Sequence, residues 1–319
     1  MDREAEWPVL DHESLAPMVG FLNRIVQVGA KYTLDQLFEP GWGNIVLDVT
    51  PRGLRTPTLR QGPIEFDVHY RLLDGVVVIE TSVGESRVPL GDGSVADFYE
   101  RFCAAVSELG MRPPGSSLLC EIPADVSRFE EDLVERTWDG GVARLIWRGF
   151  ASVAAGLEDY QAPYRGHRPR TGVMWGGFDL SSTRYRGVRS NPPTDRPAFL
   201  QHGMTEEYVS VGFFFGNAAA PEASLYGYIA PQPDGMEARS WPVEGTSWRA
   251  DLGLVLLAWS ALRATPDPHA AIVAFGDAIY DAAVDLAGWP SDLVGRRFTG
   301  WDASRVPPGE MLGGKEGTT

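Results

Sequence analysis

Strict alternation of apolar and polar residues marks the first third of the chain. From Ile64 to Leu72 every second residue is apolar, and the residues between them are charged or histidine. A period of two is typical of a half-buried antiparallel strand, because successive side chains point to opposite faces of a sheet. Strand-like runs at 44–50 and 76–82 predict two further strands, and Asp74-Gly75 predicts a tight turn before the last of them.

Helical spacing of apolar residues flanks these strands. It covers residues 14–38 before them and 95–109 after them. Ser94 and Asp97 have the spacing of a capping box, which predicts that the second helix begins at Val95. The first part of the chain is therefore expected to read helix, three strands, helix.

The second half of the chain shows the same order of patterns. The predicted helices cover 127–138, 142–160, 250–263 and 268–286, and the predicted strands cover 171–186, 206–214 and the segment around 225–229.

The repeated order predicts an α+β protein with antiparallel sheet packed against helices. We expect the protein to contain two pseudo-repeats of helix, three strands and helix, the first over 1–112 and the second over 118–290. Residues 291–319 are expected to form a mostly irregular tail. Whether the repeats make one domain or two stays open.

The three predicted strands of the second half suggest a pocket. Their alternation places aromatic and hydrogen-bonding side chains on shared faces, with apolar residues on the opposite faces. We expect catalytic roles for Asp179, Tyr208 and Tyr226. The expected substrate-binding residues are Trp175, Thr183, Arg184, Ser210, Phe214, Tyr228 and Glu206.

Asp179 carries most of the chemistry in this hypothesis. It lies among apolar and aromatic neighbours, where an unpaired carboxylate is costly, so we expect a hydrogen bond or a raised pKa. It is either a general acid or base, or the partner of a salt bridge to Arg184 or Arg52.

Composition restricts the class of partner. The net charge of -15 argues against a nucleic-acid surface and against docking on anionic membranes. No apolar run approaches the length of about 20 residues that spans a membrane, and the N-terminus does not resemble a signal peptide. We expect a cytoplasmic protein in which Cys103 and Cys120 are reduced, structural thiols. The oligomeric state stays unknown.

Motifs for cofactors are weak or missing. Residues 91–96 match the dinucleotide fingerprint formally, but hairpin strands precede them, so the capping box explains them better. The five histidines show no HExxH spacing, and the chain has neither a GxSxG elbow nor a phosphate-binding loop. We therefore expect no cofactor and no metal, although a metal site assembled from distant residues stays open.

Several segments resemble a bacterial family that is catalogued only as a domain of unknown function, number five-nine-nine-six. The resemblance runs from about Trp7 to Trp289, and its motifs carry no assigned chemistry. It rests on Val49-Thr50 with Arg52-Gly53-Leu54, on 94–99, on Trp175-Gly176-Gly177-Phe178-Asp179-Leu180 with Thr183-Arg184, on Pro221-Glu222-Ala223 with Tyr226, and on 283–289.

The resemblance also implies a divergent member. The family's usual histidines lie beside the tryptophan of the first strand, before the WGxFDL-type motif and early in the strand after it. Here these places hold Gly41 and Asn44, Gly172, and Glu206.

The leading functional hypothesis is a metal-free, cofactor-independent enzyme of small-molecule metabolism, with specialised (natural-product) biosynthesis as one setting. It acts on a largely apolar substrate by cyclisation, isomerisation or elimination in an aromatic-lined pocket. Three other interpretations stay open. They are a non-catalytic binder or carrier of an apolar small molecule, a purely structural or partner-binding protein without a cavity, and a metalloenzyme with a dispersed His, Asp and Glu site.

Overall fold

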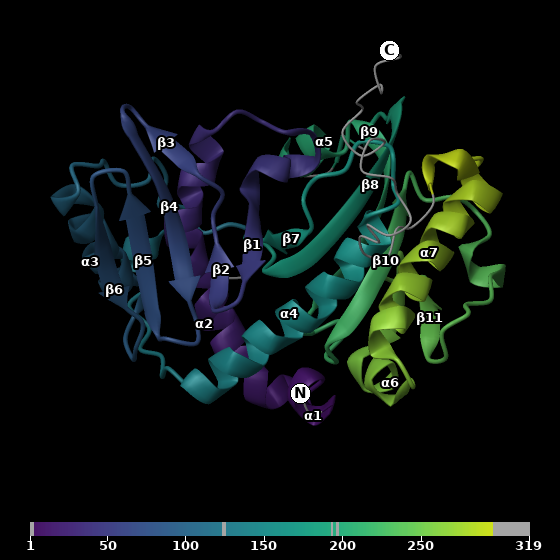
Figure 1. The fold of residues 1–319 in the computed structure, drawn as a ribbon, viewed down its shortest axis with the longest axis horizontal. Helices are drawn as coiled ribbons and strands as arrows, with labels where there is room; N and C mark the ends of the chain where they lie inside the picture. Colours follow the sequence, from purple (N-terminus) through teal and green to yellow (C-terminus); the bar gives the residue numbers. More distant parts are fainter. Residues whose placement is uncertain (1–2, 123–125, 193, 196–197, 296–319) are drawn as a thin grey trace, which may run out of the picture.

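The structure is a computed structural model, and it describes residues 3–122, 126–192, 194–195 and 198–295. Its strands join into one twisted antiparallel sheet in the order β11-β12-β10-β9-β8-β7-β1-β2-β4-β5-β6, and β3 pairs with β4 at the side (Figure 1). The described strands are β1 (Val46–Thr50), β2 (Gly53–Arg55), β3 (Leu59–Gln61), β4 (Ile64–Arg71), β5 (Val76–Thr81), β6 (Gly84–Pro89), β7 (Gly172–Met174), β8 (Asp179–Arg189), β9 (Glu206–Phe214), β10 (Ser224–Ala230), β11 (Thr246–Arg249) and β12 (Leu254–Ala258).

Helices cover the sheet on both sides. The longer ones are α2 (His12–Ala30), α3 (Val95–Glu108), α4 (Gly140–Gln161) and α7 (Pro268–Ala287). The shorter ones are α1 (Arg3–Glu6), η1 (Lys31–Asp35), η2 (Pro40–Ile45), η3 (Phe129–Glu131), α5 (Ala198–Gly203), η4 (Met236–Ala238), α6 (Trp259–Ala264) and η5 (Ser291–Leu293). The structure thus confirms the α+β class.

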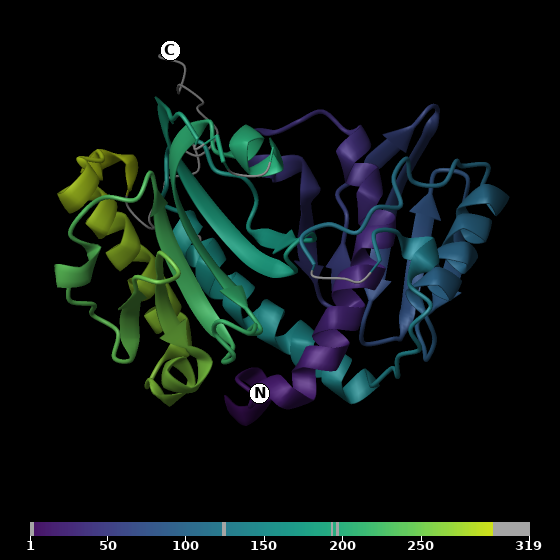
Figure 2. The ribbon, with the colours of Figure 1, turned by 180° about the vertical axis from the view of Figure 1, so that it is seen from behind.

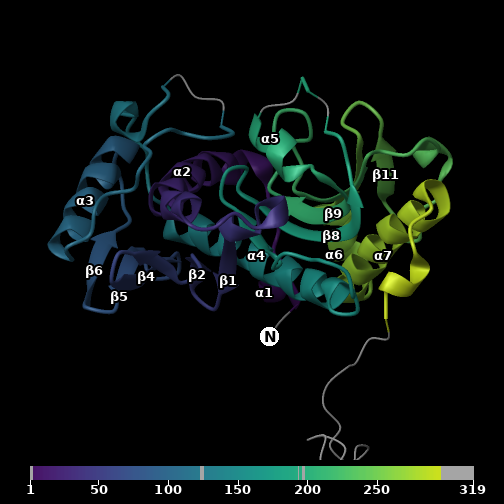
Figure 3. The same ribbon diagram turned by 90° about the horizontal axis from the view of Figure 1, so that it is seen from above.

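The helices of the two halves lie on opposite sides of the sheet. Seen from above, α2 and α3 lie on one side of the first-half strands, and α4, α6 and α7 lie on the other side of the second-half strands (Figure 3). The view from behind shows α2 crossing the middle of the molecule beside the junction of the halves (Figure 2). At that junction β1 pairs with β7 through Val46 and Leu47. One face of β8, β9 and β10 is therefore free of α4 and α7, and the candidate site lies there.

Several expected elements are confirmed. The pattern at 14–38 forms α2 and η1, and the strands expected at 44–50, 64–72 and 76–82 are β1, β4 and β5. Ser94 caps α3 through the expected capping box with Asp97.

Each half holds six strands among the described residues, where the sequence indicated three. The additional strands are short or follow a turn immediately, so they carry little periodicity of their own.

The helix expected at 127–138 is wrong. Only η3 forms there, because the segment bonds to distant backbone instead, through bridges of Leu118 with Arg128 and of Gly93 with Arg136.

The helix expected at 250–263 is also wrong over its first half. Leu254–Ala258 forms β12, which pairs with β10 on one side and β11 on the other, and helix begins only at Trp259. The tail beyond Gly295 lies outside the described residues.

The single long strand expected at 171–186 is a hairpin of β7 and β8. The turn spans 175–178 and closes with a hydrogen bond from the Phe178 N–H to the Met174 carbonyl, 2.9 Å long. This turn moves Phe178 into the core and lets Asp179 open a new strand.

Candidate functional site

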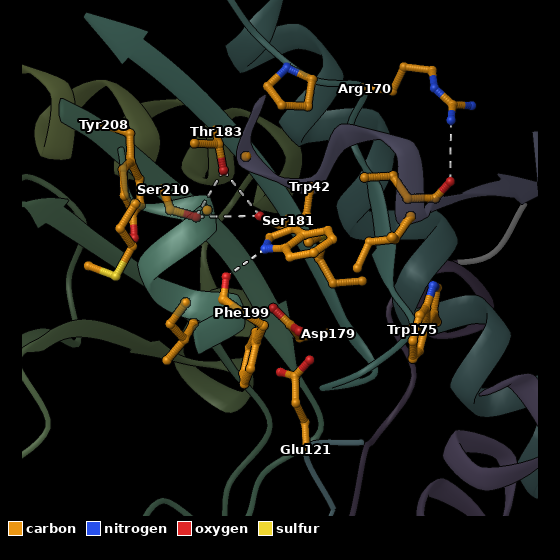
Figure 4. A pocket seen from close by; sticks show the side chains of 18 of the residues that line it. Trp42, Glu121, Arg170, Trp175, Asp179, Ser181, Thr183, Phe199, Tyr208 and Ser210 are labelled. Carbon is orange, nitrogen blue, oxygen red and sulfur yellow. Dashed lines mark hydrogen bonds between the residues drawn. The ribbon is translucent and has the colours of Figure 1, made fainter. Parts of the chain in front are cut away.

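A cavity of about 570 Å³ lies over the face of β8, β9 and β10 that points away from α4 and α7. This volume falls in the range of small-molecule sites, about 300–1,000 Å³. The three strands supply alternate residues to its wall, which are Asp179, Ser181, Thr183 and Tyr185 from β8, Tyr208 and Ser210 from β9, and Tyr226 and Tyr228 from β10. The rest of the lining comes from other elements and includes Trp42, Glu121, Arg170 and Phe199 (Figure 4). Cys120 and Met204 also belong to the lining.

The alternation of these strands separates the cavity from the core. Leu180, Val211 and Leu225 point the other way and are completely buried. Gly212 belongs to the cavity face, and its missing side chain is required there. An ideal Cβ at Gly212 would lie 2.3 Å from Cζ of Tyr226, so only glycine lets that ring cross toward Asp179.

Asp179 and Tyr226 form the polar centre of the cavity. The Tyr226 hydroxyl donates to Oδ2 of Asp179 over 2.5 Å. Burial raises the pKa of Asp179 above its ordinary value of 3.8, and the hydrogen bond from Tyr226 partly opposes that rise. Burial also raises the pKa of Tyr226 far above its ordinary value, and the negative charge of Asp179 raises it further.

A second carboxyl group, Glu121, faces the same point. Its carboxyl end lies toward that of Asp179 (Figure 4). An ideal Cβ at Gly177 would lie 2.8 Å from Oδ1 of Asp179 and 3.9 Å from Oε2 of Glu121, so both groups border one glycine. Burial raises the pKa of Glu121, the charge of Asp179 raises it further, and Lys31 opposes the rise. Paired carboxyl groups in a shielded site are a source of transferable protons.

Backbone strain gathers at this cavity. Among the described residues, three non-glycine residues have φ in the left-handed region, namely Trp42 at 60°, Glu121 at 57° and Phe178 at 54°. Trp42 and Glu121 line the cavity, and Phe178 directly precedes Asp179. Such conformations cost about 1–3 kcal/mol each and persist where the surrounding structure holds them, commonly at functional sites.

Helix α2 and the 3-10 helix after it hold Glu121 in place. Gln27 is completely buried, and its amide donates to the Cys120 carbonyl and accepts from the Cys120 N–H, both over 2.9 Å. One turn further on, Nζ of Lys31 lies 2.9 Å from Sγ of Cys120. These contacts fix the backbone of the segment that carries Glu121.

Hydroxyl groups form a second polar cluster deeper along β8 and β9. Oγ1 of Thr183 lies 3.2 Å from Oγ of Ser210, and Oγ of Ser181 lies 3.3 Å and 3.4 Å from these two oxygens (Figure 4). The hydroxyls of Tyr208 and Tyr228 are 3.5 Å apart beside them. Because each hydroxyl both donates and accepts, this cluster can reorient toward a bound ligand.

Aromatic and aliphatic side chains complete the wall. The Tyr185 and Tyr208 rings lie 5.5 Å apart, and Tyr226 stacks against Tyr228 at 6.2 Å. Nε1 of Trp42 donates to the Phe199 carbonyl over 2.8 Å, which ties the η2 segment to α5 across the cavity (Figure 4). The cavity therefore offers mostly apolar surface around two polar clusters.

Seven of the ten residues expected at the site line the cavity. They are Asp179, Tyr208, Tyr226, Trp175, Thr183, Ser210 and Tyr228. Their placement follows from the strand alternation, except for Trp175, which reaches the cavity from the β7–β8 turn and donates from Nε1 to Oγ1 of Thr33 over 3.1 Å.

Three expected residues do not line the cavity. Arg184 points to the opposite face of β8, where its guanidinium lies 3.5 Å from the centre of the Tyr160 ring and bonds to the Tyr160 carbonyl. Phe214 lies past the end of the cavity and packs against Tyr226 at 6.3 Å. Glu206 begins β9 opposite Arg189, beyond the irregularity in the β8–β9 pairing.

The alternative interpretation of Asp179, a salt bridge to Arg184 or Arg52, is wrong, because no such pair forms among the described residues. Arg184 lies on the far side of the sheet, and Arg52 pairs with Asp74 instead. The sequence interpretation also missed Glu121, Cys120, Lys31 and Trp42, none of which carries a motif.

The fold and the cavity define an α+β protein with a cavity of about 570 Å³ on an antiparallel sheet. The chain belongs to the family of unknown function DUF5996, whose model matches residues 7–296, and this confirms the resemblance seen in the sequence. No curated protein and no solved structure matches the chain.

Two further findings describe the rest of the molecule. Over the described parts of the chain, no helix is long and apolar enough to cross a membrane. Within the same residues, no three His, Cys, Asp or Glu side chains come together as a metal site would require.

Proposed function

We propose that the protein is an enzyme of small-molecule metabolism that transfers protons to and from a largely apolar substrate in this cavity. The observation that carries the proposal is the group of Asp179, Tyr226 and Glu121. It joins two carboxyl groups of raised pKa and a phenol at the wall of a 570 Å³ cavity. A carboxyl group whose pKa is shifted toward neutrality can both give and take a proton, which general acid–base catalysis requires.

The residues have distinct roles in this proposal. Asp179 exchanges the proton with the substrate, and Tyr226 stabilises the carboxylate that remains after the proton is given. Glu121 supplies the second proton position, so that a proton taken from one atom of the substrate can return at another. Isomerisation, cyclisation and elimination all require such a transfer of protons. Neither a metal nor a nucleotide takes part in the proposed reaction.

The rest of the wall selects and orients the substrate. The hydroxyls of Thr183, Ser210 and Tyr208 suit an oxygen-bearing group, and Trp175 and Met204 suit the apolar remainder. Holding the substrate in a reactive conformation away from water supplies part of the rate acceleration, because the reacting groups are already ordered before the reaction begins.

An untargeted exchange experiment tests the proposal. The purified protein is incubated in D2O with a small-molecule extract of bacterial cells, and mass spectrometry records compounds that gain deuterium or change in amount. We expect the wild type to alter a defined set of compounds, and Asp179→Asn to do so at least about 100-fold more slowly, as for loss of a general acid or base. The control is Asp74→Asn, which makes the same substitution at an aspartate that forms a surface ion pair with Arg52. Equal rates for Asp179→Asn and wild type contradict the proposal.

A non-catalytic binder of an apolar small molecule is the second candidate. The hydrogen bond from Tyr226 to Asp179 favours it, because a carboxyl group paired within the protein is also what a purely structural role requires. In that case ligands bind to wild type and Asp179→Asn with similar affinity, and no compound changes in the D2O experiment.

A further inference from the structure

Cys120 lies at the cavity wall with an ammonium group at its sulfur. Nζ of Lys31 is 2.9 Å from Sγ of Cys120, and the Lys31 side chain is only 2% exposed. Cys120 is half-buried and is one of the residues that line the cavity, and its Sγ also lies 3.8 Å from the Leu118 carbonyl oxygen. The pair thus joins a cysteine of the cavity lining to a buried cation.

A buried ammonium group needs compensation. Leaving a charge unpaired in the interior is costly, so such groups are paired or hydrogen-bonded. Around Lys31 the compensation comes from Sγ of Cys120 and from the Trp175 ring centred 4.6 Å away. A neighbouring cation and access to a cavity are the surroundings in which nucleophilic cysteines are found.

The composition of the chain makes this lysine conspicuous. The chain has 28 lysines and arginines, of which only Lys31 and Lys315 are lysines. Lysine is a compact point charge, whereas the wide guanidinium fork of arginine suits carboxylates and phosphates. A compact cation is the better partner for a single sulfur atom.

We propose that Cys120 is a nucleophile of the cavity, paired with Lys31, and that the cavity accepts small apolar molecules with an electrophilic carbon, such as a carbonyl conjugated to a double bond. This inference rests on the proposed function, because it names the substrate class of the same cavity. It replaces the purely structural role that the sequence suggested for Cys120.

The bond changes balance without an oxidant or a reductant. The thiol proton leaves to solvent as the thiolate pairs with the ammonium group of Lys31. The sulfur electron pair then forms a bond to the terminal carbon of the double bond, and the π electrons move through the conjugated system to the carbonyl oxygen. That oxygen takes the proton of the Glu121 carboxyl group, which lies one residue from the sulfur in the chain, and solvent returns a proton to the carboxylate. Expulsion of the thiolate by the reverse steps returns the proton of the oxygen to the Glu121 carboxylate and regenerates the double bond at its original position.

The chain contains its own reference thiol. Cys103 is also half-buried, but it lies on α3 outside the cavity lining, and burial raises the pKa of its thiol. The labelling rates of both thiols can be measured in the same molecule. Partial unfolding of a variant would expose both thiols, so it would not produce a change in rate at Cys120 alone.

Labelling with two electrophiles tests the inference on the full-length protein. N-ethylmaleimide is an apolar conjugated carbonyl that accepts sulfur and needs a proton at oxygen, whereas iodoacetamide loses iodide and needs none. Peptide mapping by mass spectrometry gives the rate at each cysteine. We expect Cys120 to react with both reagents at least about tenfold faster than Cys103, since the ammonium group of Lys31 lies at its sulfur.

Two variants separate the roles. Lys31→Met keeps the volume and removes the cation, and we expect it to slow Cys120 with both reagents while Cys103 keeps its rate. Glu121→Gln removes the acid, and we expect it to slow Cys120 toward N-ethylmaleimide only. Equal rates at the two cysteines, or an unchanged rate at Cys120 in Lys31→Met, overturn the inference. Because labelling requires no turnover, this outcome is independent of the D2O experiment with Asp179→Asn.

Discussion

Replacement of Asp179 by asparagine is expected to stabilise the protein increasingly as the pH rises. In the folded state burial raises the pKa of this carboxyl above 3.8, its ordinary value in the unfolded chain. Between these two pKa values the folded protein therefore holds more protons than the unfolded chain, and the free energy of unfolding of the wild type falls as the pH increases. The asparagine side chain has no such dependence.

The magnitude follows from the size of the shift. Each unit by which the pKa of Asp179 is raised removes about 1.4 kcal/mol from the free energy of unfolding above that pKa. For a protein of this size, 1.4 kcal/mol corresponds to about 2–4 °C in Tm. The difference between Asp179→Asn and wild type is expected to be smallest below pH 4, to grow through the raised pKa and then to level off. The hydrogen bond from Tyr226 adds an offset, so the pH dependence is the quantity to compare.

Thermal unfolding from pH 3 to pH 8 at constant ionic strength measures this difference. Asp74→Asn is the matched control, because hydrogen bonding to Arg52 lowers the pKa of Asp74 to about 2. The stabilisation by Asp74 is present above its unfolded pKa and is lost as the pH falls, so this variant should lose stability relative to wild type with rising pH. The reasoning is refuted if the two variants change in the same direction, or if Asp179→Asn shows no pH dependence relative to wild type.

Two predictions concern the support of Glu121. In Gly176→Ala, an ideal Cβ would lie 2.1 Å from Oε1 of Glu121, so the carboxyl group must move. We expect activity to fall at least about tenfold with little change in Tm. The control is Gly91→Ala, whose Cβ meets nothing within 4 Å, and we expect it to change neither activity nor Tm. In Gln27→Leu, the N–H and carbonyl of Cys120 lose their partners, and urea unfolding should show a loss of about 2 kcal/mol or more; an unchanged unfolding midpoint would contradict this role of Gln27.

The face of each strand was predictable from the sequence, because side-chain alternation is a local property. Tyr208, Ser210 and Tyr228 reach the cavity for this reason, and the core residues between them point away. The same pattern misplaced Phe214 and Glu206, since alternation gives the face of a strand and not the position at which a cavity ends.

The irregular parts of the site were not predictable in the same way. The β7–β8 turn closes on Phe178 with φ of 54°, a conformation that sequence rules assign to glycine. Glu121 and Cys120 follow a segment without regular structure and are placed by Gln27, 93 residues earlier in the chain than Cys120. A hydrogen bond over that separation leaves no periodic trace. The run at 254–258 was ambiguous for a related reason, because a short apolar run suits a buried strand and a helix equally.

We expect Asp179 to hold its proton more tightly than a solvated carboxyl group, at a cavity wall where a substrate can reach it. A 13C NMR titration of aspartate-labelled protein measures this directly, with the Asp179 resonance assigned by its loss in Asp179→Asn. The account predicts a titration midpoint above 3.8 that moves when a ligand fills the cavity. A midpoint at or below 3.8 would contradict it.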